Sequence, residues 1–456
     1  MTFVNREDEL RALDQWWDRP GQGMALVWGR RRVGKTALIE RFSADRRTIF
    51  HTGARRPVAD ELAILAAAAG PYLGDRDLSL NPIRDWSDAI ETLARAAATE
   101  PLLLVLDEFP ELVAAAPELP SVVRAAWDRL RSRTMLRLLL CGSAVRSVEA
   151  MREERAPLYG RFDLQLLVHP LRSWESGLLL RDLDAGERAR VWGIVGGVPL
   201  YLQWWDPDRS VRENLLRLAC TPGGLLLSEG QLVLATEADE GDLSRQVLHA
   251  IGAGRTKHNE IADAVRADPT RSLERLVELR LIERLVPVTE DRRRTRRRLY
   301  RIADNFLAFW LGVLDPYRAE IERGLGTTVI RPILEDLENH MGPRWEQAFR
   351  DHLRRLAVAG ELGEDVVAVG PFWTAAAEEP NEMDAVVLAG RRREAVLVGE
   401  AKWARVADGQ REGRLLRAKA QALPRVREDL EIAVCAREQV RSSAGVRVFT
   451  AEDLFG

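Results

Sequence analysis

Residues 29–36 read GRRRVGKT and fit the phosphate-binding pattern G-x-x-x-x-G-K-[ST] at every specified position. An apolar run at 24–28 precedes the motif and a helical pattern follows at 37–42, so the local order is strand, glycine-rich loop and helix. The glycines let backbone N–H groups turn inward around an anion, and the following helix adds the partial positive charge of its N-terminal end. The sequence therefore predicts a nucleotide-binding P-loop, around which the rest of the chain is organised.

The P-loop pattern assigns a chemical role to its last two residues. Lys35 is expected to reach the β and γ phosphates, and the hydroxyl of Thr36 is expected to bind Mg²⁺. The alternative is a chance loop between a strand and a helix, which the agreement of motif and context disfavours. The chain has no guanine-reading N-K-x-D sequence, which favours ATP as the nucleotide. The residues expected to contact it are Gly29, Arg30, Arg31, Arg32, Val33, Gly34, Lys35, Thr36 and Ala37.

Two later apolar runs end in residues suited to ATP hydrolysis. The run at 102–106 is typical of a strand buried on both faces, and Asp107 and Glu108 follow it where α/β sheets place their ligand-binding residues. Asp107 is expected to hold Mg²⁺ through water, and Glu108 to orient and polarise the attacking water as general base. The run at 135–142 leads to Ser143, which is placed to sense the γ-phosphate or the water. A plain strand-ending turn is the alternative in both cases.

The composition indicates a chain of several domains without export or membrane signals. Its 456 residues exceed the usual single-domain size, so two to four domains are expected. A net charge of -3 with 30% charged residues neither demands nor excludes nucleic acid as a partner. The N-terminus is charged almost at once, and no run approaches the roughly 18 to 20 apolar residues of a membrane span. The three cysteines show no metal or disulfide spacing, so the expected compartment is the reducing cytoplasm.

Several short motifs together resemble those of one family. They are FVNREDEL at 3–10, the P-loop, LDEF at 106–109, CGS at 141–143, APLYGR at 156–161 and Pro-Leu at 170–171. In these motifs the chain resembles the archaeal-type ATPases, which belong to the AAA+/STAND-like P-loop NTPases.

The family resemblance implies two further nucleotide contacts. Arg161 is expected to act as an arginine finger or a γ-phosphate sensor that neutralises charge developing in the transition state. A surface ion pair is the alternative for Arg161, and Arg146 competes for the same role. Residues 197–199 are similar to a lid motif that packs near the base, so Pro199 is expected to contact the nucleotide; an ordinary helix break is the alternative.

Residues 242–302 predict a winged helix, in which three helical segments precede a hairpin. Apolar stripes indicate helices around 243–251, 261–265 and 273–279, and 281–288 is expected to pair with 298–302. The hairpin tip is strongly basic, which suits contact with the DNA backbone without reading of sequence. A solvated tip or a protein contact is the alternative. The expected DNA-binding residues are Arg292, Arg293, Arg294, Arg296 and Arg297.

The C-terminal third carries a helix with Glu346, an acid at Asp384 near the opening of a strand, and the tripeptide Glu-Ala-Lys ending at Lys402 on the next strand. This order resembles the PD-(D/E)xK restriction-endonuclease-like fold. Strand alternation puts Glu400 and Lys402 on the same face. Asp384, Glu400 and Glu346 are expected to hold Mg²⁺, and Lys402 to stabilise the pentavalent phosphorane. Glu382 competes with Asp384 as a ligand, and a hairpin with an exposed ion pair is the alternative.

The sequence thus predicts an α/β P-loop NTPase of the AAA+/STAND-like type, followed by a winged helix and an α/β restriction-endonuclease-like domain. The expected divisions are an ATPase domain with a helical lid at 1–235, a winged helix at 236–305, a helical connector at 306–333 and a nuclease-like domain at 334–456. The expected function is Mg²⁺-dependent ATP hydrolysis coupled to DNA binding, with DNA cleavage left open. The alternative is a switch in which slow hydrolysis controls a protein-interaction surface. An arginine finger acting in trans would require a homo-oligomer or a protein partner.

Overall fold

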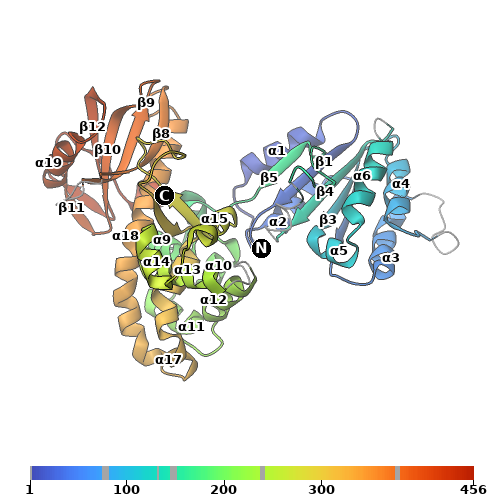
Figure 1. Cartoon of the computed structure of the whole chain (residues 1–456), viewed down its shortest axis with the longest axis horizontal. Coiled ribbons are helices and arrows are strands. Elements are labelled where there is room, and N and C mark those ends of the chain that lie inside the picture. Colours follow the sequence, from blue (N-terminus) through green and yellow to red (C-terminus); the bar gives the residue numbers. More distant parts are fainter. Residues whose placement is uncertain are drawn as a thin grey trace. The chain divides into compact units, whose positions relative to one another are not determined.

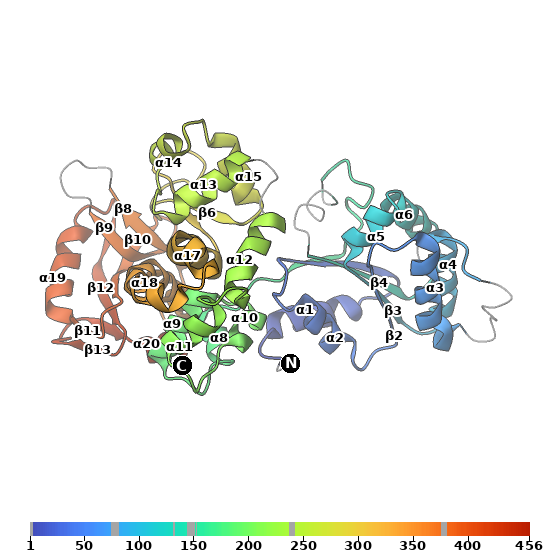
Figure 2. The same cartoon turned by 90° about the horizontal axis from the view of Figure 1, so that it is seen from below.

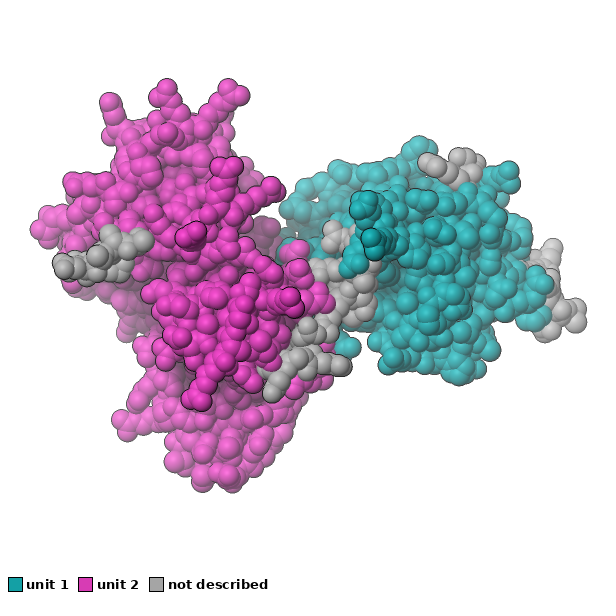
Figure 3. All heavy atoms as spheres, in the orientation of Figure 1, with its two compact units in different colours: residues 1–170 teal, residues 171–456 magenta. Residues whose placement is uncertain are grey.

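The structure is a computed structural model that describes residues 3–73, 82–130, 133–143, 151, 153–236, 242–374 and 381–456. The chain divides into two compact units, Met1–Pro170 and Leu171–Gly456, which Figure 3 draws in different colours. Each unit has its own sheet and its own hydrophobic cores. None of the helices in these described ranges has the length and apolar sequence needed to cross a bilayer.

A five-stranded parallel sheet forms the centre of the first unit (Figure 1). Its three middle strands are buried along their whole length, because each is a mostly apolar run covered by helices on both faces. This arrangement confirms the predicted α/β fold of the region. In spatial order the strands are β2 (Thr48–Thr52), β3 (Leu102–Asp107), β4 (Leu136–Gly142), β1 (Gly23–Trp28) and β5 (Leu164–Leu167).

Alternation along the strands divides the first unit into three layers. Met24 and Leu26 of β1 pack with four helices on one face of the sheet, whereas Ala25 and Val27 pack with two helices on the other. The helices of the first face are α3 (Val58–Ala69), α4 (Trp86–Ala96), α5 (Phe109–Ala115) and α6 (Leu119–Leu130). Those of the second face are α1 (Glu7–Trp17) and α2 (Lys35–Ser43). The P-loop follows β1 and therefore lies at the carboxyl edge of this sheet.

The second unit begins with helices and a short hairpin. The helices before the hairpin are α8 (Ser173–Gly177), α9 (Ala185–Val195), α10 (Pro199–Trp204), α11 (Val211–Leu218), α12 (Leu225–Thr236), α13 (Asp242–Gly252), α14 (His258–Val265) and α15 (Thr270–Glu278). The antiparallel strands β6 (Ile282–Leu285) and β7 (Leu299–Ile302) form the hairpin. The connecting helical segments are α16 (Asn305–Phe309), a π-helical turn at Trp310–Leu314, a 3₁₀ turn at Asp315–Tyr317 and α17 (Arg318–Glu322). Three helices and a hairpin thus occupy the region expected to be a winged helix, which stays a prediction.

A mixed five-stranded sheet completes the second unit (Figure 2). Its spatial order is β14 (Arg447–Phe449), β12 (Val426–Ala436), β10 (Glu394–Lys402), β9 (Glu382–Ala389) and β8 (Val366–Trp373). The long helix α18 (Gly326–Val358) and α20 (Ala451–Phe455) cover one face, and α19 (Gly409–Ala420) covers the other. Two short parallel strands, β11 (Val406–Asp408) and β13 (Gln439–Arg441), form a separate pair.

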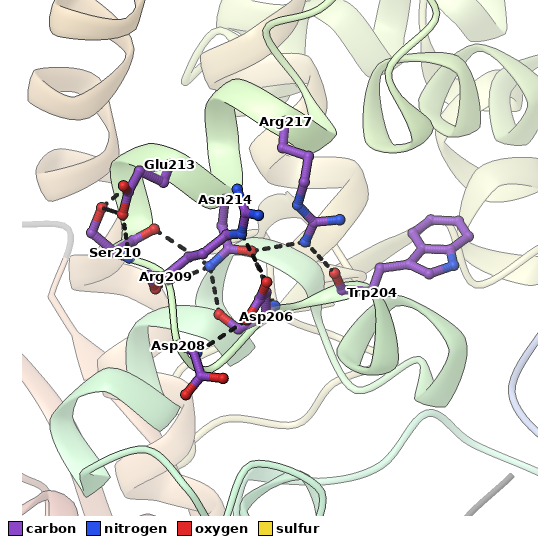
Figure 4. Close-up of polar contacts among 8 residues, drawn as sticks. All are labelled: Trp204, Asp206, Asp208, Arg209, Ser210, Glu213, Asn214 and Arg217. Atoms are coloured by element: carbon purple, nitrogen blue, oxygen red, sulfur yellow. Dashed lines mark hydrogen bonds and ion pairs between the residues drawn. The ribbon is translucent and has the colours of Figure 1, made fainter.

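A buried asparagine fixes the connection between α10 and α11 (Figure 4). The Nδ2 group of Asn214 donates to the backbone oxygens of Asp206 (2.8 Å) and Arg209 (3.2 Å), and its Oδ1 accepts from the N–H of Asp206 (3.0 Å). Ser210 and Glu213 form a capping box that starts α11. Because Asn214 is fully buried, these bonds satisfy polar groups that would otherwise be costly inside the unit.

The four predicted domains stay a prediction, and the structure gives two observations that bear on their boundaries. The first unit ends at Pro170, whereas the predicted ATPase domain with its lid extends to residue 235. The reason is packing: Trp192 of α9 shares a core with Trp345 of α18 and Phe455 of α20, so the segment expected to be a lid folds with the C-terminal part. In addition, α18 runs without a break through the boundary expected at residue 334.

Candidate functional site

The P-loop holds its lysine inside a tight backbone turn. Gly29 and Gly34 have φ values of 153° and 93°, which a side chain disfavours. A Cβ atom on Gly29 would lie 2.3 Å from the carbonyl oxygen of Val168, so only glycine fits there. Lys35 is 6% exposed, and its Nζ donates to the backbone oxygens of Gly29 (3.0 Å) and Arg30 (2.9 Å). The ammonium group is therefore positioned to exchange a carbonyl oxygen for a phosphate oxygen.

A chain of hydrogen bonds joins the P-loop helix to the ends of two neighbouring strands. The Thr36 hydroxyl donates to Asp107 Oδ2 at 3.0 Å, and the other oxygen of Asp107 accepts the N–H of Glu108 at 3.0 Å. The Ser143 hydroxyl donates to Glu108 Oε2 at 2.8 Å. The structure therefore brings Thr36, Asp107, Glu108 and Ser143 together at one edge of the sheet. Ser143, expected to sense the γ-phosphate or the water, contacts the expected general base.

The backbone at Glu108 is unusual for a residue with a side chain. It adopts the left-handed conformation, with φ 48° and ψ 45°, and serves as N-cap of α5. Pro110 in the first turn of α5 suits a helix start, because its ring presets the helical φ. The left-handed turn lets β3 end and α5 begin within one residue while the Glu108 carboxylate stays beside Ser143.

Arg6 supports the P-loop from outside the motif. It precedes α1 in the left-handed conformation, and its side chain is almost fully buried. One guanidinium nitrogen, Nη2, donates to the backbone oxygens of Val33 (2.9 Å) and His169 (2.7 Å), while Nη1 pairs with Glu9 at 2.9 Å. The sequence assigns no role to Arg6, although it lies in the first family motif. Its contact with His169 spans 163 positions, which no local pattern reveals.

We expect Arg6→Ala to lower the free energy of unfolding of the first unit by about 3 kcal/mol, because it leaves the buried carbonyl group of Val33 and the partly buried one of His169 without this donor. The same change should weaken ATP binding, since Val33 belongs to the P-loop. Urea unfolding and nucleotide titration measure both effects. The matched control is Arg11→Ala, which removes an exposed arginine paired with Asp8 and is expected to change stability by less than about 0.5 kcal/mol. Equal effects of the two changes would exclude a special role for Arg6.

Two residues expected at the nucleotide are not brought to the P-loop within the first unit. Arg161 forms a two-point ion pair with Asp128, at 2.9 and 3.1 Å, on the exposed surface. It lies two positions before Asp163, whose N–H donates to the oxygen of Met24 near the start of β1, so Arg161 is at the sheet edge opposite the P-loop. The surface ion pair is thus the observed arrangement, and a nucleotide contact of Arg161, in cis or in trans, stays a prediction. Pro199 begins α10 in the second unit, where its role stays a prediction, and Arg146 lies outside the described residues.

The C-terminal residues expected to form a phosphodiesterase centre lie near one another. Asp384 Oδ2 on β9 accepts the N–H of Ala401 on β10 at 2.7 Å, next to Glu400 and Lys402. Glu400 and Lys402 form an ion pair on the same face of β10, as strand alternation predicts, and Lys419 lies 3.4 Å from the other oxygen of Glu400. Two lysines therefore neutralise the Glu400 carboxylate.

The electrostatics around Asp384 are unfavourable for a carboxylate. Burial raises the pKa of Asp384 to about 8, and the nearby carboxylates of Glu346 and Glu400 add to this shift. The same causes raise the pKa of Glu382. A cation would relieve this repulsion, which fits the expected metal ligands. However, no group of three acidic, histidine or cysteine side chains within the described ranges is arranged to hold a metal ion, so these carboxylates would have to turn toward a shared cation.

The basic hairpin tip is exposed and partly neutralised by its own carboxylates. Arg297 pairs with Glu290 at 2.9 Å, and Arg294 lies 3.9 Å from Asp291. The remaining expected DNA contacts, Arg292, Arg293 and Arg296, are exposed and carry no ion pair within the described part of the chain. The structure thus leaves three of the five predicted arginines as uncompensated surface charge.

The parallel sheet, the P-loop and the acidic end of β3 define a P-loop ATPase. Residues 3–204 match the family described as an ATPase domain predominantly from Archaea. Residues 310–414 match a family described as archaeal and bacterial proteins of unknown function. The match agrees with the motifs of the sequence and shows an ATPase domain at residues 3–204, which supports binding and hydrolysis of ATP.

Three similar proteins can be compared with this chain. An uncharacterized protein of Methanocaldococcus jannaschii is 26% identical over 413 residues, which cover 88% of this chain and 87% of that protein. An uncharacterized ATP-binding protein of the same organism is 48% identical over 40 residues, 9% of this chain and 68% of that protein. Among solved structures, a Walker-type ATPase of Pyrococcus abyssi superposes with a TM-score of 0.52 at 21% identity, covering 68% of this chain and 96% of that one. This likeness supports the fold.

Proposed function

We propose that the chain hydrolyses ATP with Mg²⁺ and couples this reaction to DNA binding, and to DNA cleavage, by its second unit. The observation that carries the ATPase part is the hydrogen-bonded series from Thr36 through Asp107 and Glu108 to Ser143. These contacts support the proposal, because they gather a hydroxyl, two carboxylates and a second hydroxyl beside the P-loop, which are the groups that phosphoryl transfer to water uses.

In the proposed reaction each residue of the first unit has one task. Lys35 binds the β and γ phosphates, and Thr36 and Asp107 hold the metal ion, which neutralises phosphate charge when bound. Glu108 orients the attacking water and accepts its proton. Ser143 fixes the Glu108 carboxylate through the 2.8 Å hydrogen bond, so it is a positioning residue.

The proposal for the second unit rests on the neighbourhood of Asp384, Glu400 and Lys402. A buried carboxylate with raised pKa beside another carboxylate suits Mg²⁺, because the cation offsets the repulsion. Lys402 would stabilise negative charge on the phosphorus centre during cleavage. Arginines of the hairpin region supply positive charge for the DNA backbone.

Supercoiled plasmid incubated with the protein, ATP and Mg²⁺ or Mn²⁺ tests the cleavage part. We expect nicking that falls about 100-fold or more in Asp384→Asn and in Lys402→Ala, because each change removes a metal ligand or a transition-state charge. Gel electrophoresis, which separates supercoiled from nicked plasmid, measures the rate of nicking. Glu382→Gln is the matched control two positions earlier on β9, and it should keep most of the activity if Asp384 is the ligand. Intact plasmid alongside ongoing ATP hydrolysis would refute cleavage.

A second candidate is a nucleotide switch whose C-terminal part binds without cleaving. The observation that favours it is the pairing of Glu400 with both Lys402 and Lys419, which leaves this carboxylate neutralised by the protein itself. Slow ATP turnover that does not respond to DNA supports the switch, whereas turnover stimulated by DNA supports the coupled enzyme.

A further inference from the structure

A cavity of about 850 Å³ lies within the second unit, between the β6–β7 hairpin, the C-terminal half of α18 and the edge strand β8. Its volume is typical of sites that bind small molecules or parts of larger ligands. Six arginines from four different segments line it: Arg284, Arg292, Arg301, Arg350, Arg354 and Arg393.

The walls of the cavity are fixed by hydrogen bonds between its segments. The N–H of Val288, just beyond β6, donates to the oxygen of Pro371 on β8 at 2.8 Å. Arg393 Nη2 donates to the oxygen of Val288 at 2.9 Å. A Cβ atom on Gly370 would lie 3.1 Å from Val288, so the absence of a side chain lets the two segments approach closely. The cavity is therefore a built feature of the unit.

The charges that line the cavity do not cancel. Each of its four carboxylates already has an arginine partner: Glu283 pairs with Arg301, Asp351 with Arg354, Glu290 with Arg297 and Asp291 with Arg294. By contrast, Arg284, Arg292 and Arg393 form no ion pair with any residue that the structure describes. The Nε group of Arg284 is buried and lacks a hydrogen-bond partner in the same ranges. A surplus of positive charge thus faces the cavity.

Arg350 connects this cavity to the candidate phosphodiesterase centre. It is 2% exposed, it lines the cavity, and its Nη1 donates to the backbone oxygen of Asp384 at 2.7 Å. A ligand in the cavity would consequently lie one side chain away from the strand that carries Asp384.

We propose that this cavity binds the phosphate groups of a nucleic acid strand and holds the strand next to Asp384. Planar guanidinium groups form paired hydrogen bonds with phosphate oxygens, and the three arginines of the cavity that form no ion pair within the described ranges supply these donors. The proposal deepens the DNA-binding part of the proposed function and assigns that binding to the cavity in place of the hairpin tip. Free phosphate compounds share the chemistry and are separated from nucleic acid by the test.

The test compares two double variants in binding a fluorescein-labelled 12-nucleotide single strand, followed by anisotropy without ATP and with EDTA. Arg284→Gln with Arg292→Gln removes two charges from the cavity lining. Arg293→Gln with Arg296→Gln removes two exposed charges from the same hairpin outside the lining. We expect the changes at Arg284 and Arg292, called the lining pair, to weaken binding of the strand at least about tenfold. The changes at Arg293 and Arg296, called the tip pair, should weaken it less than about threefold. The lining pair should also lower the slope of log affinity against log salt by about 0.7 per lost contact.

Each outcome decides the proposal. The proposal is overturned if the Arg293→Gln, Arg296→Gln protein loses as much affinity as the Arg284→Gln, Arg292→Gln protein. It is also overturned if the Arg284→Gln, Arg292→Gln protein binds the strand like the wild type. If the strand does not bind the wild-type protein, calorimetry with tripolyphosphate in the Lys35→Ala protein, whose P-loop phosphate site is impaired, takes its place. If tripolyphosphate binds the Lys35→Ala protein and the added changes Arg284→Gln and Arg292→Gln abolish this binding, the cavity binds small phosphate compounds. If tripolyphosphate does not bind, or still binds after these changes, the proposal is overturned. Thermal melting of each variant checks its folding. Arg284→Lys, which keeps the positive charge, should melt like the wild-type protein. ATP hydrolysis is measured in a separate assay, so a negative result for the cavity does not count against the proposed ATPase activity.

Discussion

Glu108→Gln is expected to lower the rate of ATP hydrolysis about 10²- to 10⁴-fold while ATP still binds. Glutamine keeps the size of the side chain and accepts the hydrogen bond from Ser143, but an amide does not take the proton of the attacking water. Phosphate release under saturating ATP measures the rate, and titration with a fluorescent ATP analogue measures the affinity. The expected result is a bound but stable nucleotide.

Two further variants sharpen this test. Glu111→Gln, one turn later in α5, removes a carboxylate outside the hydrogen-bonded series and should leave the rate nearly unchanged. Ser143→Ala removes the hydroxyl that holds Glu108 and should lower the rate about tenfold, since one hydrogen bond to a charged group is lost. Normal hydrolysis by Glu108→Gln would show that another group is the general base.

Lys35→Ala is expected to weaken ATP binding about 100-fold or more and thereby to remove hydrolysis at ordinary ATP concentrations. The ammonium group is the buried cation of the P-loop, and its loss leaves the phosphate charge without a counter-charge from this position. Ligand-induced stabilisation is a direct readout, because a nucleotide at 100 times its dissociation constant stabilises a protein by about 2.7 kcal/mol. We expect ATP to raise the melting temperature of the wild-type protein but not of the variant.

The matched control for Lys35 is Lys257→Ala, which removes an exposed lysine from the second unit. This variant should bind ATP and respond to it in thermal melting as the wild type does. If ATP stabilised the Lys35→Ala protein equally well, the nucleotide would bind somewhere other than the P-loop.

Local patterns in the sequence were sufficient to predict the parallel α/β sheet of the first unit. The P-loop, the apolar strand ending at Asp107 and the strand leading to Ser143 are each recognisable within a few residues, because glycine turns and buried parallel strands leave local signatures. The hydrogen bond between Glu108 and Ser143 was not predictable, since it depends on the spatial order of strands β3 and β4.

The remaining features depend on contacts between distant parts of the chain. Arg6 reaches His169 across the first unit, and Trp192 meets Phe455 across the second. The arginine cavity exists only because the hairpin packs against β8 through Val288. Sequence periodicity shows which face of an element is apolar, but it does not show which partner covers that face. The ligand sets expected around Asp384 stay predictions for the same reason.

The left-handed backbone at Glu108 has a consequence for how the enzyme balances stability against activity. The left-handed conformation raises the free energy of a residue with a Cβ atom by about 1 kcal/mol, whereas glycine adopts it freely. The position that would gain stability from glycine is therefore the one that we propose to carry the catalytic carboxylate. If Glu108 is the general base, Glu108→Gly should stabilise the first unit and abolish hydrolysis, so stability and activity would change in opposite directions at this residue.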